Sequence, residues 1–134
     1  MAELISVGNN GKLVFGDYSL AEKAKADGFE FAGDIYKVKT FGEITKLERN
    51  GLFVYESVPG TDVTDFEADD KEVSFLVKGT TDTQITLGLE EEKEYKLYID
   101  GTNTGKMKTN LGGKLAMSVA LNPGQAVEVK VVKQ

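Results

Sequence analysis

The sequence predicts an all-β protein, an antiparallel sandwich with Greek-key-like connections, and three observations lead to this prediction. Apolar residues alternate with polar residues along most of the chain, which is the period of a strand with one buried face. Turn-forming pairs such as Asn50-Gly51 and Asp100-Gly101 separate these runs. In the second half, about seven short strands follow one another at roughly ten-residue spacing, a pattern typical of sandwiches and Greek-key barrels.

The first sixty residues predict a smaller β-meander or partial barrel. A short helix is expected within it, because Ser19-Leu20-Ala21-Glu22 matches a capping box and residues 21–26 have helix-forming composition. Asp27-Gly28 ends this run, so the helix would have at most about two turns. An extended crossing is the alternative. We expect strands at residues 4–7, 12–15, 29–31, 36–40, 44–47 and 52–58.

The second half is organised around residues 95–121, which predict three strands and two turns in one run. The turns are Asp100-Gly101 and Gly112-Gly113, where glycine supplies the backbone freedom. The last of these strands has an apolar face and a face of small residues, namely Ala116, Ser118 and Ala120. Small residues on a second face suggest close cover by another layer or by another copy of the chain. We expect strands at residues 63–66, 73–77, 83–89, 95–99, 106–108, 115–121 and 127–131.

Pro59-Gly60 marks the expected domain boundary, which we place between residues 58 and 63. The prediction is a small β-subdomain at residues 1–60 and a β-sandwich-like domain at residues 61–134. One continuous unit is the alternative, because a chain of 134 residues suits one domain or two very small ones.

The composition excludes several chemistries. The chain has no histidine and no cysteine, so Ser-His-Asp and Cys-His triads, disulfides and zinc sites have no support. No phosphate-loop or dinucleotide-binding signature occurs, and we expect no cofactor. The net charge is −6 and neither half is basic, which argues against nucleic acid and anionic membrane surfaces as partners.

The N-terminal segment, MAELISVGNNGK, carries none of the features of a secretory leader. It lacks a basic start and a long apolar run, and no other segment is apolar enough to insert into a membrane. The expected location is therefore the cytoplasm. A mature secreted form is the alternative.

Two sets of side chains are candidates for binding. Tyr36, Tyr55 and Tyr98 could form a platform for carbohydrate, although packing in the core is the alternative for each. The acidic run at residues 62–72 offers a candidate calcium cluster, because hard cations prefer several oxygen ligands. A solvated acidic turn is the favoured alternative for that run. The candidate calcium ligands are Asp62, Asp65, Asp69 and Asp70.

Residues 34–60, DIYKVKTFGEITKLERNGLFVYESVPG, and residues 106–115, KMKTNLGGKL, carry a resemblance. They resemble a family of short proteins from gut Clostridia whose members often bear the label endosialidase, and the resemblance covers nearly the whole chain. The label implies hydrolysis of internal bonds in polysialic acid. Sialidase-type sites hold the sugar carboxylate with several arginines, whereas this chain has a single arginine, Arg49. The second half also resembles accessory β-sandwiches of glycan-active enzymes.

Three functions are consistent with these observations. The first is a non-catalytic β protein that binds a partner or itself, for example through an edge strand at residues 127–132. The second is a glycan-binding module with exposed tyrosines along a groove. The third is a carboxylate-based glycosidase, which needs two acidic side chains about 5 to 10 Å apart across a cleft. A concave pocket that gathers tyrosine, aspartate and Arg49 would favour a ligand site.

Overall fold

The computed structural model describes residues 3–134, which form thirteen β-strands and no helix. The predicted all-β, antiparallel fold class is confirmed. Within the described residues no helix is long and apolar enough to cross a membrane. The first half contains β1 (Ile5–Val7), β2 (Leu13–Phe15), β3 (Ala24–Phe31), β4 (Asp34–Phe41), β5 (Ile44–Arg49) and β6 (Leu52–Val58). The second half contains β7 (Asp62–Ala68), β8 (Glu72–Lys78), β9 (Thr83–Gly88), β10 (Glu94–Ile99), β11 (Thr102–Lys108), β12 (Lys114–Val119) and β13 (Val127–Lys133).

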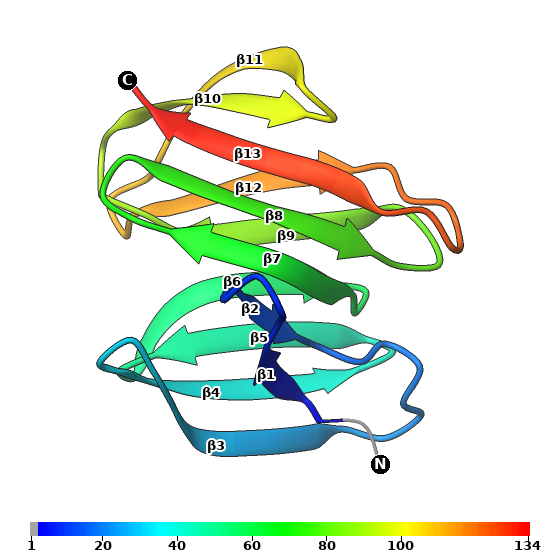
Figure 1. The fold of residues 1–134 in the computed structure, drawn as a ribbon. Coiled ribbons are helices and arrows are strands. Elements are labelled where there is room, and N and C mark those ends of the chain that lie inside the picture. Colours follow the sequence, from blue (N-terminus) through cyan, green and yellow to red (C-terminus); the bar gives the residue numbers. More distant parts are fainter. Residues whose placement is uncertain (1–2) are drawn as a thin grey trace.

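The strands form two antiparallel sheets that face each other. The seven-stranded sheet has the order β1-β2-β7-β8-β13-β10-β11, and the six-stranded sheet has the order β12-β9-β6-β5-β4-β3. Figure 1 shows the six-stranded sheet behind the seven-stranded one, with the first half of the chain at the bottom and the second half at the top. The two sheets are offset, with β10 and β11 at the top end and β3 at the bottom end of the molecule.

Both halves of the sequence contribute strands to both sheets. In the seven-stranded sheet β2 pairs with β7, where Phe15 lies opposite Val63. In the six-stranded sheet β6 pairs with β9, where Tyr55 lies opposite Leu87. The expected boundary at residues 58–63 falls where the chain crosses from β6 in one sheet to β7 in the other. Independent folding of residues 1–60 stays a prediction.

The core is one cluster of inward-facing side chains from both sheets. At its centre Phe15 and Phe75 both meet Tyr55 edge to face, with ring centroids 5.3 and 5.5 Å apart. Phe66 packs against both phenylalanines. These contacts follow from the period-two pattern, because alternate residues of each strand point into the space between the sheets.

The two strongest hairpin signals of the sequence are confirmed. Asn50 and Gly51 have φ of 52° and 79°, and Asp100 and Gly101 have φ of 50° and 80°. Positive φ at both central residues is what the favoured two-residue hairpin turn requires. The turn after β10 is so tight that the return strand begins at Thr102, earlier than the expected residue 106.

The expected helix at residues 21–26 is wrong. β3 begins at Ala24 and pairs with β4, with Ala24 opposite Thr40 and Ala26 opposite Val38. Ser19 caps no helix, because its N–H and hydroxyl both donate to the carboxylate of Asp17. A short segment has a marginal helix propensity, and the strand pairing overrides it. The alternative of an extended segment is the one observed.

The expected edge strand at residues 127–132 is also wrong. β13 lies inside the seven-stranded sheet, between β8 and β10. An alternating apolar pattern fits an edge strand and an inner strand equally well, so the sequence could not separate them. The strands at the sheet edges are β1, β11, β3 and β12. The small face, with Ala116 and Ser118 in β12 and Ala120 directly after it, is exposed, and no layer of residues 3–134 covers it.

Candidate binding groove

One end of the sandwich is hollowed into a groove between the two sheets. Two neighbouring cavities of about 730 and 380 Å³ open there. They meet along five residues that line both, so they form one continuous depression, which we call the strand-end groove. The shared residues are Arg49, Phe66, Ala68, Asp69 and Glu72. The β3–β4, β5–β6 and β7–β8 turns gather at this end, on the left of Figure 1.

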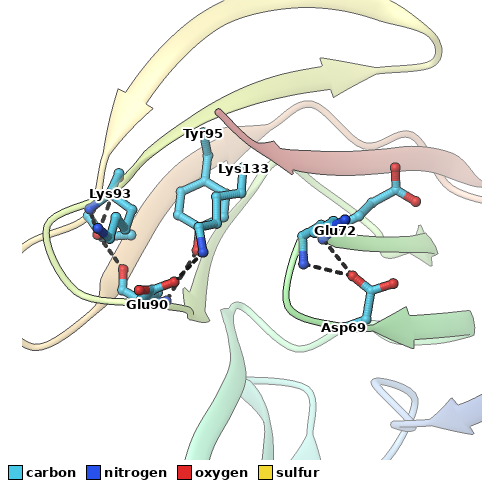
Figure 2. A network of polar contacts seen from close by, with 8 residues as sticks. Asp69, Glu72, Glu90, Lys93, Tyr95 and Lys133 are labelled. Atoms are coloured by element: carbon cyan, nitrogen blue, oxygen red, sulfur yellow. Dashed lines mark hydrogen bonds and ion pairs between the residues drawn. The ribbon is translucent and has the colours of Figure 1, made fainter.

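The β7–β8 turn forms one wall of the groove and is held by Asp69. Its carboxylate accepts the backbone N–H groups of Lys71 and Glu72 at 2.8 and 2.9 Å. These two hydrogen bonds lower the pKa of Asp69, because they stabilise the charged carboxylate. Asp69 therefore serves the turn itself, and its carboxylate lies beside Glu72 at the groove (Figure 2).

The β9–β10 loop and the last residues of β13 form a second part of the wall. The carboxylate of Glu90 binds the ammonium group of Lys133, which lowers the pKa of Glu90 and raises that of Lys133. The hydroxyl of Tyr95 accepts the backbone N–H of Glu90 at 3.2 Å, and the hydroxyl of Thr109 donates to its carbonyl at 2.6 Å. Figure 2 shows Glu90, Tyr95 and Lys133 gathered on one side and Asp69 and Glu72 on the other.

Arg49 stands where the two cavities meet. It is the last residue of β5, directly before the Asn50-Gly51 turn, and its side chain is half-buried. Within residues 3–134 no hydrogen bond and no ion pair engages its guanidinium group. A guanidinium group carries five N–H donors and stays charged at any ordinary pH, so Arg49 offers the groove an unused set of donors.

The larger cavity has apolar walls beside Arg49. Leu52 is 72% exposed and lines the cavity next to Phe53 and Leu89. The ammonium group of Lys114 lies 4.5 Å from the centroid of the Phe53 ring, a cation–π contact that orients the ring. The groove thus combines an apolar surface, several carboxylates and four cationic residues, namely Lys12, Arg49, Lys114 and Lys133.

Of the three tyrosines proposed as ligand contacts, only Tyr36 lines the groove. It lies on β4 in the smaller cavity, together with Arg49, and is 5% exposed. Tyr55 is fully buried at the centre of the core, where its hydroxyl pairs with that of Thr61 at 2.7 Å. Burial raises the pKa of Tyr55 well above its ordinary value. Tyr98 is half-buried on β10 and lines neither cavity.

The four aspartates proposed as calcium ligands have separate partners. Asp62 accepts the backbone N–H of Tyr18 at 2.9 Å, and Asp65 accepts the side-chain amide of Asn10 at 2.7 Å. Asp69 holds its own turn, and Asp70 is exposed. Across residues 3–134, no group of three or more acidic side chains is placed to hold a metal ion.

Asp62→Asn should raise the free energy of unfolding at pH 7, and the gain should vanish at acid pH. Burial raises the pKa of Asp62 because it penalises the charged form, and this outweighs the N–H of Tyr18. At pH 7 the carboxylate is charged in both states, and the charge is less favourable in the folded protein than in the unfolded chain. The free energy of unfolding therefore falls as the pH rises through the folded pKa. Asparagine keeps an oxygen for Tyr18 and carries no charge.

The gain should stay below about 1 kcal/mol, because Asp62 is only half-buried and pairs with Lys78 across the sheet. Urea unfolding of both proteins at pH 7 and at pH 3 measures it. A loss of stability in the variant at pH 7 would show that attraction to Lys78 dominates over burial.

No protein-family model matches the chain, and no curated protein or solved structure matches it. The fold and the groove define the protein as a two-sheet β-sandwich with a concave site at one end of its strands. Sandwiches carry many unrelated functions, so the function is inferred from the chemistry of the groove.

The sequence had pointed to Arg49 and Tyr36, but not to Leu52, Phe53 or Lys114 as site residues. Leu52 and Phe53 lie on β6, in the same hairpin as Arg49, with Leu52 directly opposite Arg49. Lys114 lies on β12, and only the strand order β12-β9-β6-β5 brings it to the site. The one local signal was the single arginine beside a strong turn.

Proposed function

We propose that this protein is a non-catalytic binding module that holds an acidic oligosaccharide in the strand-end groove. The observation that carries the proposal is the position of Arg49. Its half-buried guanidinium group lies at the junction of the two cavities and has no partner within residues 3–134. A planar guanidinium fork matches a carboxylate in geometry and charge, so a carboxylate on the ligand would use these donors fully.

The remaining lining suits a sugar. Sugar hydroxyls can donate to the carboxylates of Asp69 and Asp70, while the C–H faces of a ring can pack on Leu52 and Leu89. The same carboxylates would repel a densely charged polyanion, which favours a ligand with few acid groups and many hydroxyls. The groove crosses the ends of strands, so it offers no free strand edge to an extended peptide.

The carboxylates of the groove support binding over hydrolysis. A glycosidase needs one carboxylic acid with a raised pKa to protonate the leaving group. Asp69 and Glu90 instead have lowered pKa values, because backbone N–H groups hold one and Lys133 holds the other. A raised pKa is found at Asp62, which lines neither cavity of the groove. The glycosidase implied by the family resemblance is therefore ranked below binding.

The test is calorimetric titration with a tetrasaccharide that alternates hexuronic acid and N-acetylhexosamine. Its carboxyl-reduced counterpart, in which each acid is an alcohol, is the matched control ligand. We expect the acidic form to bind. Arg49→Gln should raise its Kd about 10- to 100-fold, which corresponds to the loss of one hydrogen bond between charged groups. Arg49→Lys should fall between the two, because an ammonium group cannot make the two-point contact.

Lys106→Gln is the matched control protein, because Lys106 is an exposed cation on β11 outside the groove. It should bind like the wild type. Equal affinity for the acidic and the reduced tetrasaccharide would refute the assignment of Arg49 as the carboxylate contact. Unchanged affinity in Arg49→Gln would refute it as well.

A further inference from the structure

β12 differs from the other three edge strands because it has no register shift and its one lysine, Lys114, is at its first residue. β1 is only three residues long. β3 and β11 each have a register shift in their only pairing, and β11 also carries Lys106 and Lys108. Short length, bulges and lysines are the usual means of blocking an edge. β12 pairs with β9 over six residues without a shift, and its small outward residues, Ala116 and Ser118, are neutral and exposed.

The open hydrogen-bonding groups of β12 can be identified from Lys114. Asn110 binds both backbone groups of Lys114, since its N–H donates to the carbonyl and its side-chain oxygen accepts the N–H. The backbone of Lys114 therefore points away from β9. Backbone groups alternate between the two sides of an antiparallel strand, so those of Ala116 and Ser118 point away from β9 too. Within residues 3–134 no strand lies on that side.

We propose that β12 pairs antiparallel with β12 of a second copy of the chain, about a two-fold axis beside Met117. Ala116 then faces the partner's Ser118, and Ser118 faces the partner's Ala116. Each of these pairs exchanges two backbone hydrogen bonds, so all four open groups on each strand find a partner. The two six-stranded sheets become one continuous sheet across the dimer.

The sequence of β12 favours this occupant because it is nearly symmetric about Met117. Residues 115–119 read apolar, small, apolar, small, apolar. In the paired register Leu115 lies opposite the partner's Val119 on the core side. Asn110 already occupies both backbone groups of Lys114, so the pairing is limited to residues 115–119, which carry no charge. Pairing with β3 of another copy would produce an open fibre, and the register shift of β3 disfavours it.

A contact of this size predicts a weak dimer, with a Kd on the order of 0.1 mM. Sedimentation equilibrium up to about 1 mM protein should show the mass rise from 14.6 kDa towards twice that value. Ser118→Pro removes the outward N–H and leaves the ladder to β9 intact, so the Kd should rise at least about 10-fold. Ser118→Ala is the matched control, and it should keep the Kd within about twofold because the backbone is unchanged.

The absence of cysteine allows a second test that does not depend on proline being tolerated. Chains with Ala116→Cys and chains with Ser118→Cys are mixed and oxidised. The expected product is enriched in disulfides between the two kinds of chain, because these positions face each other in the proposed register. A strict monomer at about 1 mM, or no enrichment of the mixed disulfide, would overturn the proposal. Arg49→Gln should leave both results unchanged, so the dimer and the groove are tested separately.

Discussion

Thr45→Val should lower the free energy of unfolding by about 3 to 5 kcal/mol, although valine has nearly the same shape as threonine. Thr45 is fully buried between the sheets. Its hydroxyl donates to the carbonyl of Thr61 at 2.8 Å and accepts the N–H of Thr61 at 3.0 Å. Because its proton is used in this way, the hydroxyl of Thr40, 2.8 Å away, donates to it. Valine would remove a partner from three buried polar groups at once.

Urea unfolding measures this loss, and two variants isolate its cause. Thr45→Ser keeps the hydroxyl and removes one methyl group, so it should cost only about 1 kcal/mol. Thr86→Val makes the same chemical change on β9, where Thr86 is only half-buried. Its free energy of unfolding should stay within about 0.5 kcal/mol of that of the wild type. If Thr45→Val stays within about 1 kcal/mol of the wild type, the buried network does not hold the two sheets in register.

Gly60→Ala should lower the free energy of unfolding by about 3 kcal/mol. The chain crosses between the sheets at Gly60, where there is no room for a side chain. A Cβ there would overlap the carbonyl oxygen of Phe41. The N–H of Gly60 also donates to the carbonyl of Gly42 at 3.0 Å, which fixes the backbone in this position. The clash is with backbone atoms, so a side-chain rotation cannot relieve it.

Gly42→Ala is the matched control for Gly60→Ala, because both residues belong to the same contact. A Cβ at Gly42 would meet its nearest atom, the carbonyl oxygen of Tyr18, at 3.5 Å, an ordinary contact. Its cost should be below about 1 kcal/mol. Similar thermal unfolding midpoints for the two variants would contradict the close approach of β4–β5 to residue 60.

The strands were predictable because their signals are local. Asn50-Gly51 marks a hairpin through the positive φ that both residues must adopt, and β6 follows with the expected bounds. The helix expected at residues 21–26 failed for the opposite reason. Its local composition is overridden by Ala24 and Ala26 pairing with β4, a partner that the segment itself does not reveal.

The groove was only partly predictable because its residues come together through the sheet order. Arg49 and Tyr36 face each other on β5 and β4, which are neighbours in sequence, so a local hairpin places them together. Lys114 lies on β12, which is joined to β5 through β9 and β6. The periodicity of the strands does not reveal this order. Tyr55 was a candidate ligand contact by residue type, but its pairing with the buried Leu47 and Leu87 puts it in the core.

The most direct test of the groove as the binding site is an NMR titration of the ¹⁵N-labelled protein with the same acidic tetrasaccharide. We predict that the Nε–Hε signal of Arg49 shifts on binding, together with the backbone amides of Leu52 and Lys114. The carboxyl-reduced tetrasaccharide should leave the Arg49 side-chain signal in place. Shifts that leave Arg49 unchanged and cluster around Tyr98, on the outer face of β10, would contradict the proposed site.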